Sequence, residues 1–231
     1  MSKLLNLSTD DILARAEVCL GICKTTGVKY NLEYPNGGRN PDAPHPFDIL
    51  QYAGYKYYVS DCIGTALWIQ GISRKFDGTP TIPAFPDTPN ITGGYMNCTS
   101  IVQEAMGFER RKGQSPYVGG RFFKILDKPE PGCLILFSGR TKAFPTNPRH
   151  GHIATVVSAP ENPVYPDKEG IAKWISRDTR NHRAPLQVVQ CGSFGKYDNK
   201  AVRKTDASTW LRHQSMFVKL NRELLLNGDT V

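Results

Sequence analysis

Apolar residues recur at helical spacing near the start of the chain. Four of them follow one another at intervals of four, three and four residues: Ile12, Ala16, Cys19 and Cys23. This spacing places them on one face of a helix. Ser8 is a typical helix cap with acidic residues behind it, and Gly27 is a typical end signal. Cys19 and Cys23 could in principle hold a metal, but we interpret them as two thiols of the core.

Two further segments follow a helical pattern. Residues 62–70 carry apolar side chains at helical spacing, and either Ser60 or Asp61 could cap the first turn. A third helix is predicted around residues 98–107, ended by Gly107. Residues 28–48 are rich in Tyr, Asn, Pro and Gly, which is typical of an ordered loop.

Three apolar runs in the second half of the chain predict strands. They cover residues 133–137, 152–158 and 186–191. The tail, residues 210–226, is expected to pack as a closing strand or helix. Helices followed by closely spaced strands indicate an α+β fold with an antiparallel sheet. At 231 residues, we expect a single domain over 1–231 with inserted loops near 77–97 and 159–185. The second insertion is read as a flap, or as a helix around residues 171–174.

The net charge of +8 favours polyanionic partners such as nucleic acid, anionic membranes or a bacterial cell wall. No run of about 18 apolar residues occurs, so we expect no membrane span. The first residues lack an apolar signal segment, so no secretory leader is expected. The chain also has no motif in which aromatic and basic residues interleave, which argues against nucleic acid.

The six cysteines form no pair with zinc-site spacing, and neither a metal site nor a disulfide framework is expected. Cys62 differs from the others because it lies in the first turn of a predicted helix. There the helix dipole and the free N–H groups can lower a thiol pKa from about 8.5 to roughly 3.5–7.5. The same N–H groups could hold the oxyanion of a tetrahedral intermediate. The alternative is that Cys62 is a buried helix residue.

A cysteine nucleophile needs a histidine base and a group that orients the imidazole. His152 follows Gly151 at the start of a predicted strand, where it could face a helix N-terminus, and His150 competes for the role. The amide oxygen of Gln190 could accept the imidazole N–H from a neighbouring strand. The alternative for Gln190 is a residue that merely bonds to backbone.

These segments, in this order, resemble the NlpC-type branch of papain-like cysteine hydrolases, which includes the CHAP amidases and many phage lysins. The matching segments span residues 27–191 and read Gly27-Val28-Lys29-Tyr30 with Gly37-Gly38, Asp61-Cys62-Ile63-Gly64, Gly132-Cys133-Leu134-Ile135-Leu136-Phe137, Gly151-His152-Ile153 and Val188-Val189-Gln190-Cys191. Three departures stand out. Ile63 replaces the usual serine, Cys133 replaces an aspartate, and the gap before the third polar residue is long. Other candidates for that third place lie in the gap: Asp178, Asn181 and His182.

The resemblance implies a papain-like fold and a hydrolase that cleaves an amide bond of bacterial peptidoglycan without metal or cofactor. Cys62 would be the nucleophile, His152 the base and Gln190 the orienting residue. Tyr30, with Tyr34 as its rival, would help to hold the oxyanion, and Asp61 is expected to contact the substrate.

The resemblance also implies a phage protein that acts on the host cell wall. It would reside in the virion tail, with phage tail proteins as further partners, or in the host cytoplasm. The alternative is a catalytically inactive module of the same fold that binds the wall or builds the virion.

Overall fold

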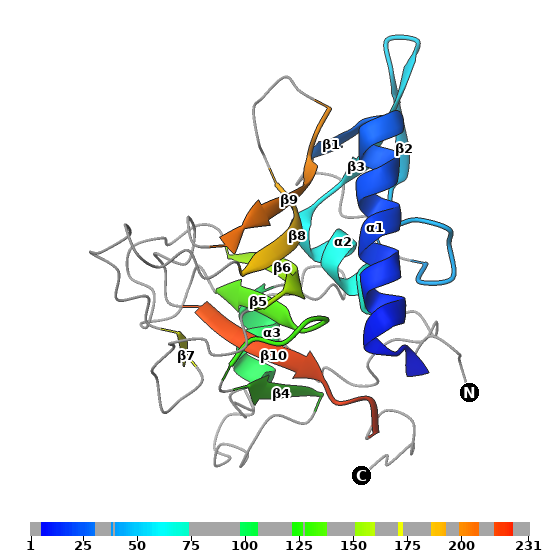
Figure 1. Ribbon diagram of the computed structural model, residues 1–231. Helices are drawn as coiled ribbons and strands as arrows, with labels where there is room; N and C mark the ends of the chain where they lie inside the picture. The colour runs from blue at the N-terminus through cyan, green and yellow to red at the C-terminus, as the bar shows by residue number, and fades with distance from the viewer. Residues whose placement is uncertain are drawn as a thin grey trace, which may run out of the picture.

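The computed structural model describes residues 6–30, 38, 40–73, 98–105, 122–126, 128–137, 151–159, 171–172, 186–192, 199–207 and 215–223. These residues form an α+β structure with two sheets (Figure 1). The helices are α1 (Thr9–Thr25), α2 (Cys62–Ile69) and α3 (Cys98–Ala105). The strands are β1 (Val28–Tyr30), β2 (Asp48–Tyr52), β3 (Tyr55–Ser60), β4 (Phe123–Leu126), β5 (Leu134–Phe137), β6 (His152–Ser158), β7 (Ile171–Ala172), β8 (Gln187–Cys191), β9 (Val202–Asp206) and β10 (Ser215–Leu220).

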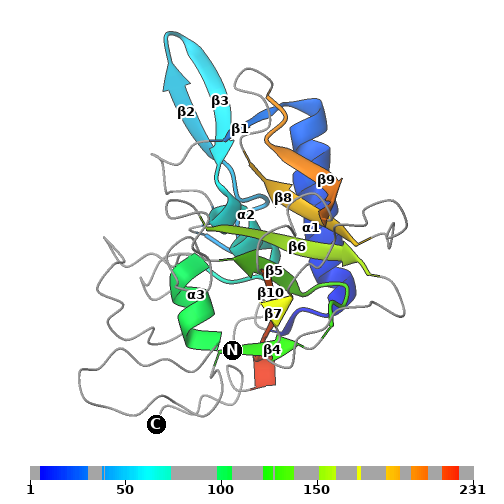
Figure 2. The same ribbon diagram turned by 90° about the vertical axis from the view of Figure 1, so that its left-hand side faces the viewer.

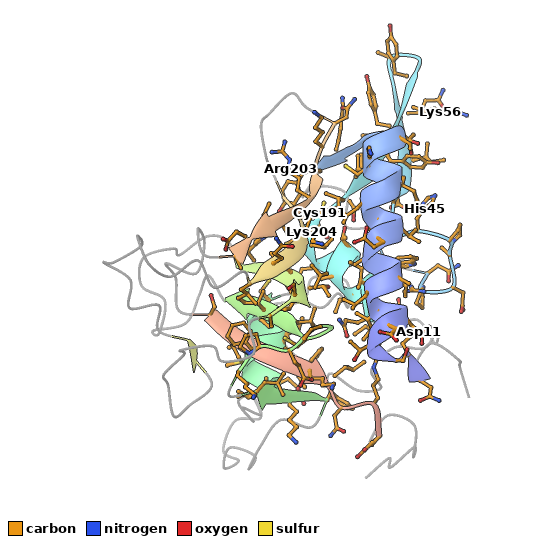
Figure 3. The ribbon with its side chains drawn as sticks, viewed as in Figure 1. Asp11, His45, Lys56, Cys191, Arg203 and Lys204 are labelled. Atoms are coloured by element: carbon orange, nitrogen blue, oxygen red, sulfur yellow. The ribbon has the colours of Figure 1, made fainter. Side chains whose placement is uncertain are left out.

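Helix α1 begins and ends where its sequence signals predict. The Ser8 hydroxyl accepts the Asp11 N–H at 3.1 Å, and the Asp11 carboxylate accepts the Ser8 N–H at 2.8 Å. This reciprocal pair of hydrogen bonds is a capping box. In Figure 3, Asp11 lies at the end of α1 that is remote from strands β2 and β3. Gly27 follows the helix at φ +83°, a conformation that favours glycine. The predicted apolar face is buried, Cys19 and Cys23 included, which confirms their place in the core.

The larger sheet has the strand order β4-β10-β5-β6-β8-β9, and β7 also pairs with β10. The strand pairs in this sheet are antiparallel, as predicted. The three apolar runs became β5, β6 and β8, and the tail supplies β10. Strands β4 and β9 were not predicted, because their charged and apolar residues alternate only briefly. The prediction of a helix around residues 171–174 is wrong where the structure describes it, because Ile171 and Ala172 form a strand.

A smaller sheet with the order β1-β3-β2 corrects the two ends of the predicted loop over residues 28–48, whereas residues 40–47 form a loop as predicted. Strand β1 pairs in parallel with β3, and β2 and β3 form an antiparallel hairpin. Ala53 and Gly54 join its strands at φ +49° and +82°, the left-handed pair that a two-residue type I′ turn requires. The hairpin extends away from the larger sheet (Figure 2). Its strands were missed because β2 places Ile49 and Leu50 side by side and three of the six residues of β3 are Tyr, so neither shows a clear apolar alternation.

Helix α2 is buried on every side, between α1 and strands β6 and β8 (Figure 1). Two arginines bind its C-terminal carbonyls. The Arg15 guanidinium donates to the Trp68 carbonyl at 2.6 and 2.9 Å and lies 3.7 Å from the Trp68 ring. Arg222 donates to the Gln70 carbonyl at 2.9 Å, and burial lowers its pKa to about 10. Cations at this end complement the helix dipole. These bonds fix α2 relative to α1 and the chain's C-terminal segment.

Helix α3 packs against β4 and β5, next to α2 in the same apolar cluster. The Glu104 carboxylate accepts the backbone N–H groups of Phe122 and Phe123 at 2.6 and 2.9 Å, which joins α3 to the start of β4. All six cysteines of the chain are free and buried. Over the ranges described, the helices fall short of the length and apolar character needed to cross a lipid bilayer.

Candidate active site

Strand β3 ends at Ser60, and a single residue, Asp61, separates it from helix α2. Asp61 has an extended backbone, and its carboxylate oxygen accepts the Gly64 N–H at 2.7 Å, so Asp61 is the N-cap. Cys62 is therefore the first residue of the helix, as predicted, and its side chain is 5% exposed. Helix N-termini stabilise negative charge through the dipole and free N–H groups. Asp61 is itself buried and occupied as a cap, and its contact with a substrate stays a prediction.

His152 is the first residue of β6, and it lies between Cys62 and Gln190. Its side chain is hydrogen-bonded to Cys62, and its Nε2 lies 2.7 Å from Gln190 Oε1. An amide oxygen can only accept, so the Nε2 atom carries the proton and donates it. This leaves Nδ1 as the nitrogen that faces the sulfur and can take its proton. The structure thus brings the three predicted catalytic side chains together from α2, β6 and β8.

Thr205 holds the amide of Gln190 in place. Gln190 Nε2 donates to the Thr205 hydroxyl at 2.6 Å, while Gln190 Oε1 accepts from His152. This contact anchors the amide nitrogen on β9 while the amide oxygen faces His152. Sequence reasoning missed Thr205, and no local signal marks it in the polar strand β9. Other predicted candidates, His150, Asp178, Asn181 and His182, lie outside the described residues.

Tyr30 ends strand β1 and is hydrogen-bonded to Cys62. The parallel pairing of β1 with β3 places Tyr30 opposite Ser60, two residues before Cys62. Burial, and then the negative charges of Cys62 and Asp61, raise the pKa of Tyr30 well above its usual value. Its hydroxyl therefore stays protonated and available as a donor. Its rival Tyr34 lies outside the described residues.

The electrostatics of the site favour a charged imidazole. Burial by itself lowers the pKa of His152. The hydrogen bond to Cys62 and its charge, with smaller contributions from Gln190 and Asp61, more than offset that effect and raise the pKa above 6.5. A histidine with a raised pKa next to a sulfur at a helix N-terminus is the arrangement that supports a thiolate–imidazolium pair.

A second thiol lies beside the site but is in a different environment. Cys191 on β8 is completely buried and hydrogen-bonded to the Thr65 hydroxyl, which in turn lies 2.9 Å from the Ser60 hydroxyl. Burial raises the pKa of Cys191 well above its ordinary value. Cys191 is therefore a neutral packing residue, whereas Cys62 has a histidine partner.

Two glycines touch where the chain crosses the first turn of α2. Gly38 has φ +78°, and its N–H donates to the Pro46 carbonyl at 2.8 Å. A Cβ atom at Gly38 would lie 2.2 Å from the Gly64 carbonyl oxygen. Only glycine fits this close approach, which fixes residue 38 against the turn that carries Cys62.

Substitution of Gly38 by alanine is expected to lower the free energy of unfolding by about 2–4 kcal/mol, since it combines a left-handed backbone with a steric clash. Gly54→Ala is the matched control, because Gly54 has φ +82° but a Cβ atom there would meet no other atom within 4 Å. It should cost only about 1–2 kcal/mol. Urea unfolding of both variants measures the difference. Equal decreases in the free energy of unfolding of the two variants would contradict a stabilising role for the close contact between Gly38 and Gly64.

Within the described ranges, no group of three or more His, Cys, Asp or Glu side chains could hold a metal ion. Comparison of the chain with protein-family models, with curated proteins and with solved structures found no match.

Proposed function

We propose that this chain is a papain-like cysteine hydrolase that cleaves an amide bond of bacterial peptidoglycan. The observation that carries the proposal is the hydrogen-bonded series Cys62–His152–Gln190, in which the imidazole tautomer leaves Nδ1 facing the sulfur. A nucleophile, a base and an orienting residue in contact are the parts that nucleophilic catalysis by a thiol needs.

The reaction would proceed in two halves. His152 Nδ1 accepts the proton of Cys62 Sγ, and the sulfur attacks the amide carbonyl carbon. Backbone N–H groups at the start of α2 and the Tyr30 hydroxyl donate to the oxyanion. The C–N bond breaks as His152 returns the proton to the leaving amine, which leaves a thioester. Water, deprotonated by His152, then attacks the thioester and releases a carboxylic acid and the thiol.

Two observations support peptidoglycan as the substrate. The motifs around Cys62, His152 and Gln190 resemble those of wall-cutting enzymes, and the net charge of +8 suits an anionic cell wall. The proposal includes a phage origin, with the protein acting on the host wall either from the virion tail or after release from the host cytoplasm.

Mass spectrometry of material released from purified peptidoglycan tests the proposal. We expect soluble fragments, each carrying a new amine or a new carboxylic acid at one cleaved amide bond. Protein alkylated with iodoacetamide before the assay is the control and should release none. Tight binding to the wall with no released fragments would contradict the enzyme and favour an inactive wall-binding module.

A further inference from the structure

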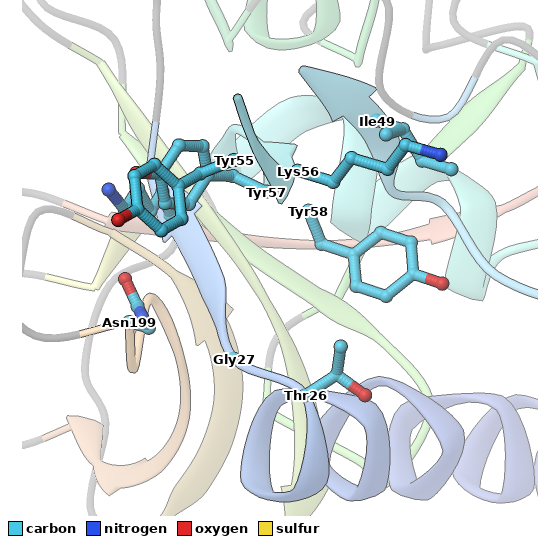
Figure 4. Close-up of a pocket in the computed structure, with 9 residues that line it drawn as sticks. Thr26, Gly27, Ile49, Tyr55, Lys56, Tyr57, Tyr58 and Asn199 are labelled. Atoms are coloured by element: carbon cyan, nitrogen blue, oxygen red, sulfur yellow. The ribbon is translucent and has the colours of Figure 1, made fainter. Parts of the chain in front are cut away.

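A pocket of about 290 Å³ lies between the β2–β3 hairpin and the C-terminal end of α1. Figure 4 shows the rings of Tyr55 and Tyr57 on one side of it with Asn199 below, and Lys56 with the Tyr58 ring on the other. Its volume is near the lower limit of about 300–1,000 Å³ for small-ligand sites. The pocket therefore suits one small unit of a larger ligand.

Aromatic faces form a platform on one side of the pocket. The ring centroids of Tyr55 and Tyr57 are 6.3 Å apart, and Tyr55 is 67% exposed. Lys29 Nζ lies 3.6 Å from the centroid of the Tyr57 ring, which holds this ring and the cation together. The negative face of an aromatic ring attracts the polarised C–H groups of a sugar, and the phenol hydroxyls and the Asn199 amide can bond to sugar hydroxyls.

The charge of the pocket selects for an anion. Lys29 and Lys56 both line it, and none of its nine lining residues is acidic. An aromatic site for a cationic ligand would need acidic or uncharged walls, whereas two ammonium groups repel a cation. A ligand that combines an apolar ring face with a carboxylate or phosphate fits both features.

Two strands, β1 and β3, connect the pocket to the site of Cys62. Strand β3 carries Tyr55 to Tyr58 and ends one residue before the cap Asp61, and β1 runs beside it from the pocket to Tyr30. Cys62 follows Tyr57 by five positions, which is about 17 Å of extended chain. A polymer bound in the pocket could therefore extend to the sulfur.

We propose that this pocket, which we call the hairpin pocket, binds an acidic glycan of the bacterial cell wall. A sugar ring would pack on Tyr55 and Tyr57 with its carboxylate or phosphate at Lys29, and Lys56, on the opposite side of the pocket, would attract a further acidic group of the same polymer. This inference rests on the proposed function for the identity of the polymer. The acidic group has two sources in a wall, the carboxylates of peptidoglycan stems and the phosphates of teichoic acid.

Binding is measured with the full chain carrying Cys62→Ala, so that no cleavage occurs. The probes are peptidoglycan stripped of teichoic acid, purified teichoic acid whose phosphate chain carries N-acetylglucosamine, and a single-stranded oligonucleotide. Binding to the stripped wall identifies the carboxylate source, and binding to teichoic acid identifies the phosphate source. Either result, without comparable binding of the oligonucleotide, is expected.

Two substitutions in the same background test the pocket. Tyr55→Ser removes an exposed ring, and Lys56→Glu reverses a charge at the hairpin. Each should weaken wall binding by about tenfold. Lys204→Glu is the matched control, since Lys204 is also exposed but lies on β9, away from the hairpin (Figure 3). It should weaken binding by less than about twofold.

Three results would overturn the inference: no binding to either wall polymer, pocket-dependent binding of the oligonucleotide, or equal losses in Lys56→Glu and Lys204→Glu. The last would indicate attraction by overall charge alone. Because Cys62→Ala is used throughout, these outcomes are independent of cleavage. If the wild-type chain releases no fragments, the proposed hydrolase activity is rejected. Glycan binding that depends on the hairpin pocket would still support this inference.

Discussion

Replacement of Cys62 by alanine is expected to abolish the release of peptidoglycan fragments, with the rate falling by about 10⁴-fold or more. The sulfur forms the bond to the carbonyl carbon, and no neighbouring group among the described residues can take its place. Cys191 is close but completely buried, with a pKa raised well above the ordinary thiol value. Fragment release from purified walls, followed by mass spectrometry, measures the loss.

Cys133→Ala is the matched control, because it removes the same atom from a buried site next to β5. Burial raises the pKa of the Cys133 thiol to about 12, so it takes no part in chemistry at neutral pH. This variant should keep most of the activity of the folded protein. Iodoacetamide should label Cys62 faster than any other cysteine. Activity in Cys62→Ala, or labelling of Cys62 no faster than that of Cys133, would reject the mechanism.

Replacement of His152 by alanine should lower the cleavage rate by about 10²–10⁴-fold, the usual contribution of general acid–base catalysis. Without the imidazole, the sulfur loses its proton acceptor and the leaving amine loses its proton donor. His45→Ala is the control, since its ring packs on Phe47 instead, at a centroid distance of 5.6 Å. The cleavage rate of His45→Ala should fall by less than about fivefold. Comparable losses in both variants would argue against a special role for His152.

The same substitution tests the raised pKa of His152 through stability. The folded protein binds this proton more tightly than the unfolded chain, whose histidine has a pKa near 6.5. The stabilisation is therefore complete below about pH 6.5 and is lost as the pH rises through the folded-state pKa. Urea unfolding from about pH 5 to about pH 9 should show the wild type losing stability relative to His152→Ala as the pH rises. The opposite slope would contradict the thiolate–imidazolium pair.

Local signals were sufficient to predict the helices and strands that position Cys62. The cap at Ser8, the spacing of the apolar face of α1 and the glycine after it all act within one or two helical turns. The cap and first turn at Asp61 and Cys62 are equally local. Continuous apolar runs identified β5, β6 and β8 because strands buried on both faces carry few polar residues.

Elements whose stability depends on distant partners were missed. Strand β1 has only three residues, and its partners in β3 lie 30 positions further along the chain, as in the pair Val28 and Tyr58. In the hairpin of β2 and β3, Ile49 and Leu50 are adjacent and β3 is rich in Tyr, so the hairpin lacks a clear apolar alternation. Strand β7 has two residues and exists only through its pairing with β10.

The order of residues along the chain alone determined that Cys62 would begin a helix and that His152 would begin a strand, because capping and periodicity are properties of neighbouring residues. The meeting of Cys62, His152, Gln190 and Tyr30 was decided by the tertiary structure, which brings four elements to one place. The tertiary structure also decided which atoms face each other: Thr205 anchors the Gln190 amide nitrogen, and the amide oxygen accepts the imidazole N–H. Side-chain contacts across a sheet depend on register, and register arises only when the strands pair.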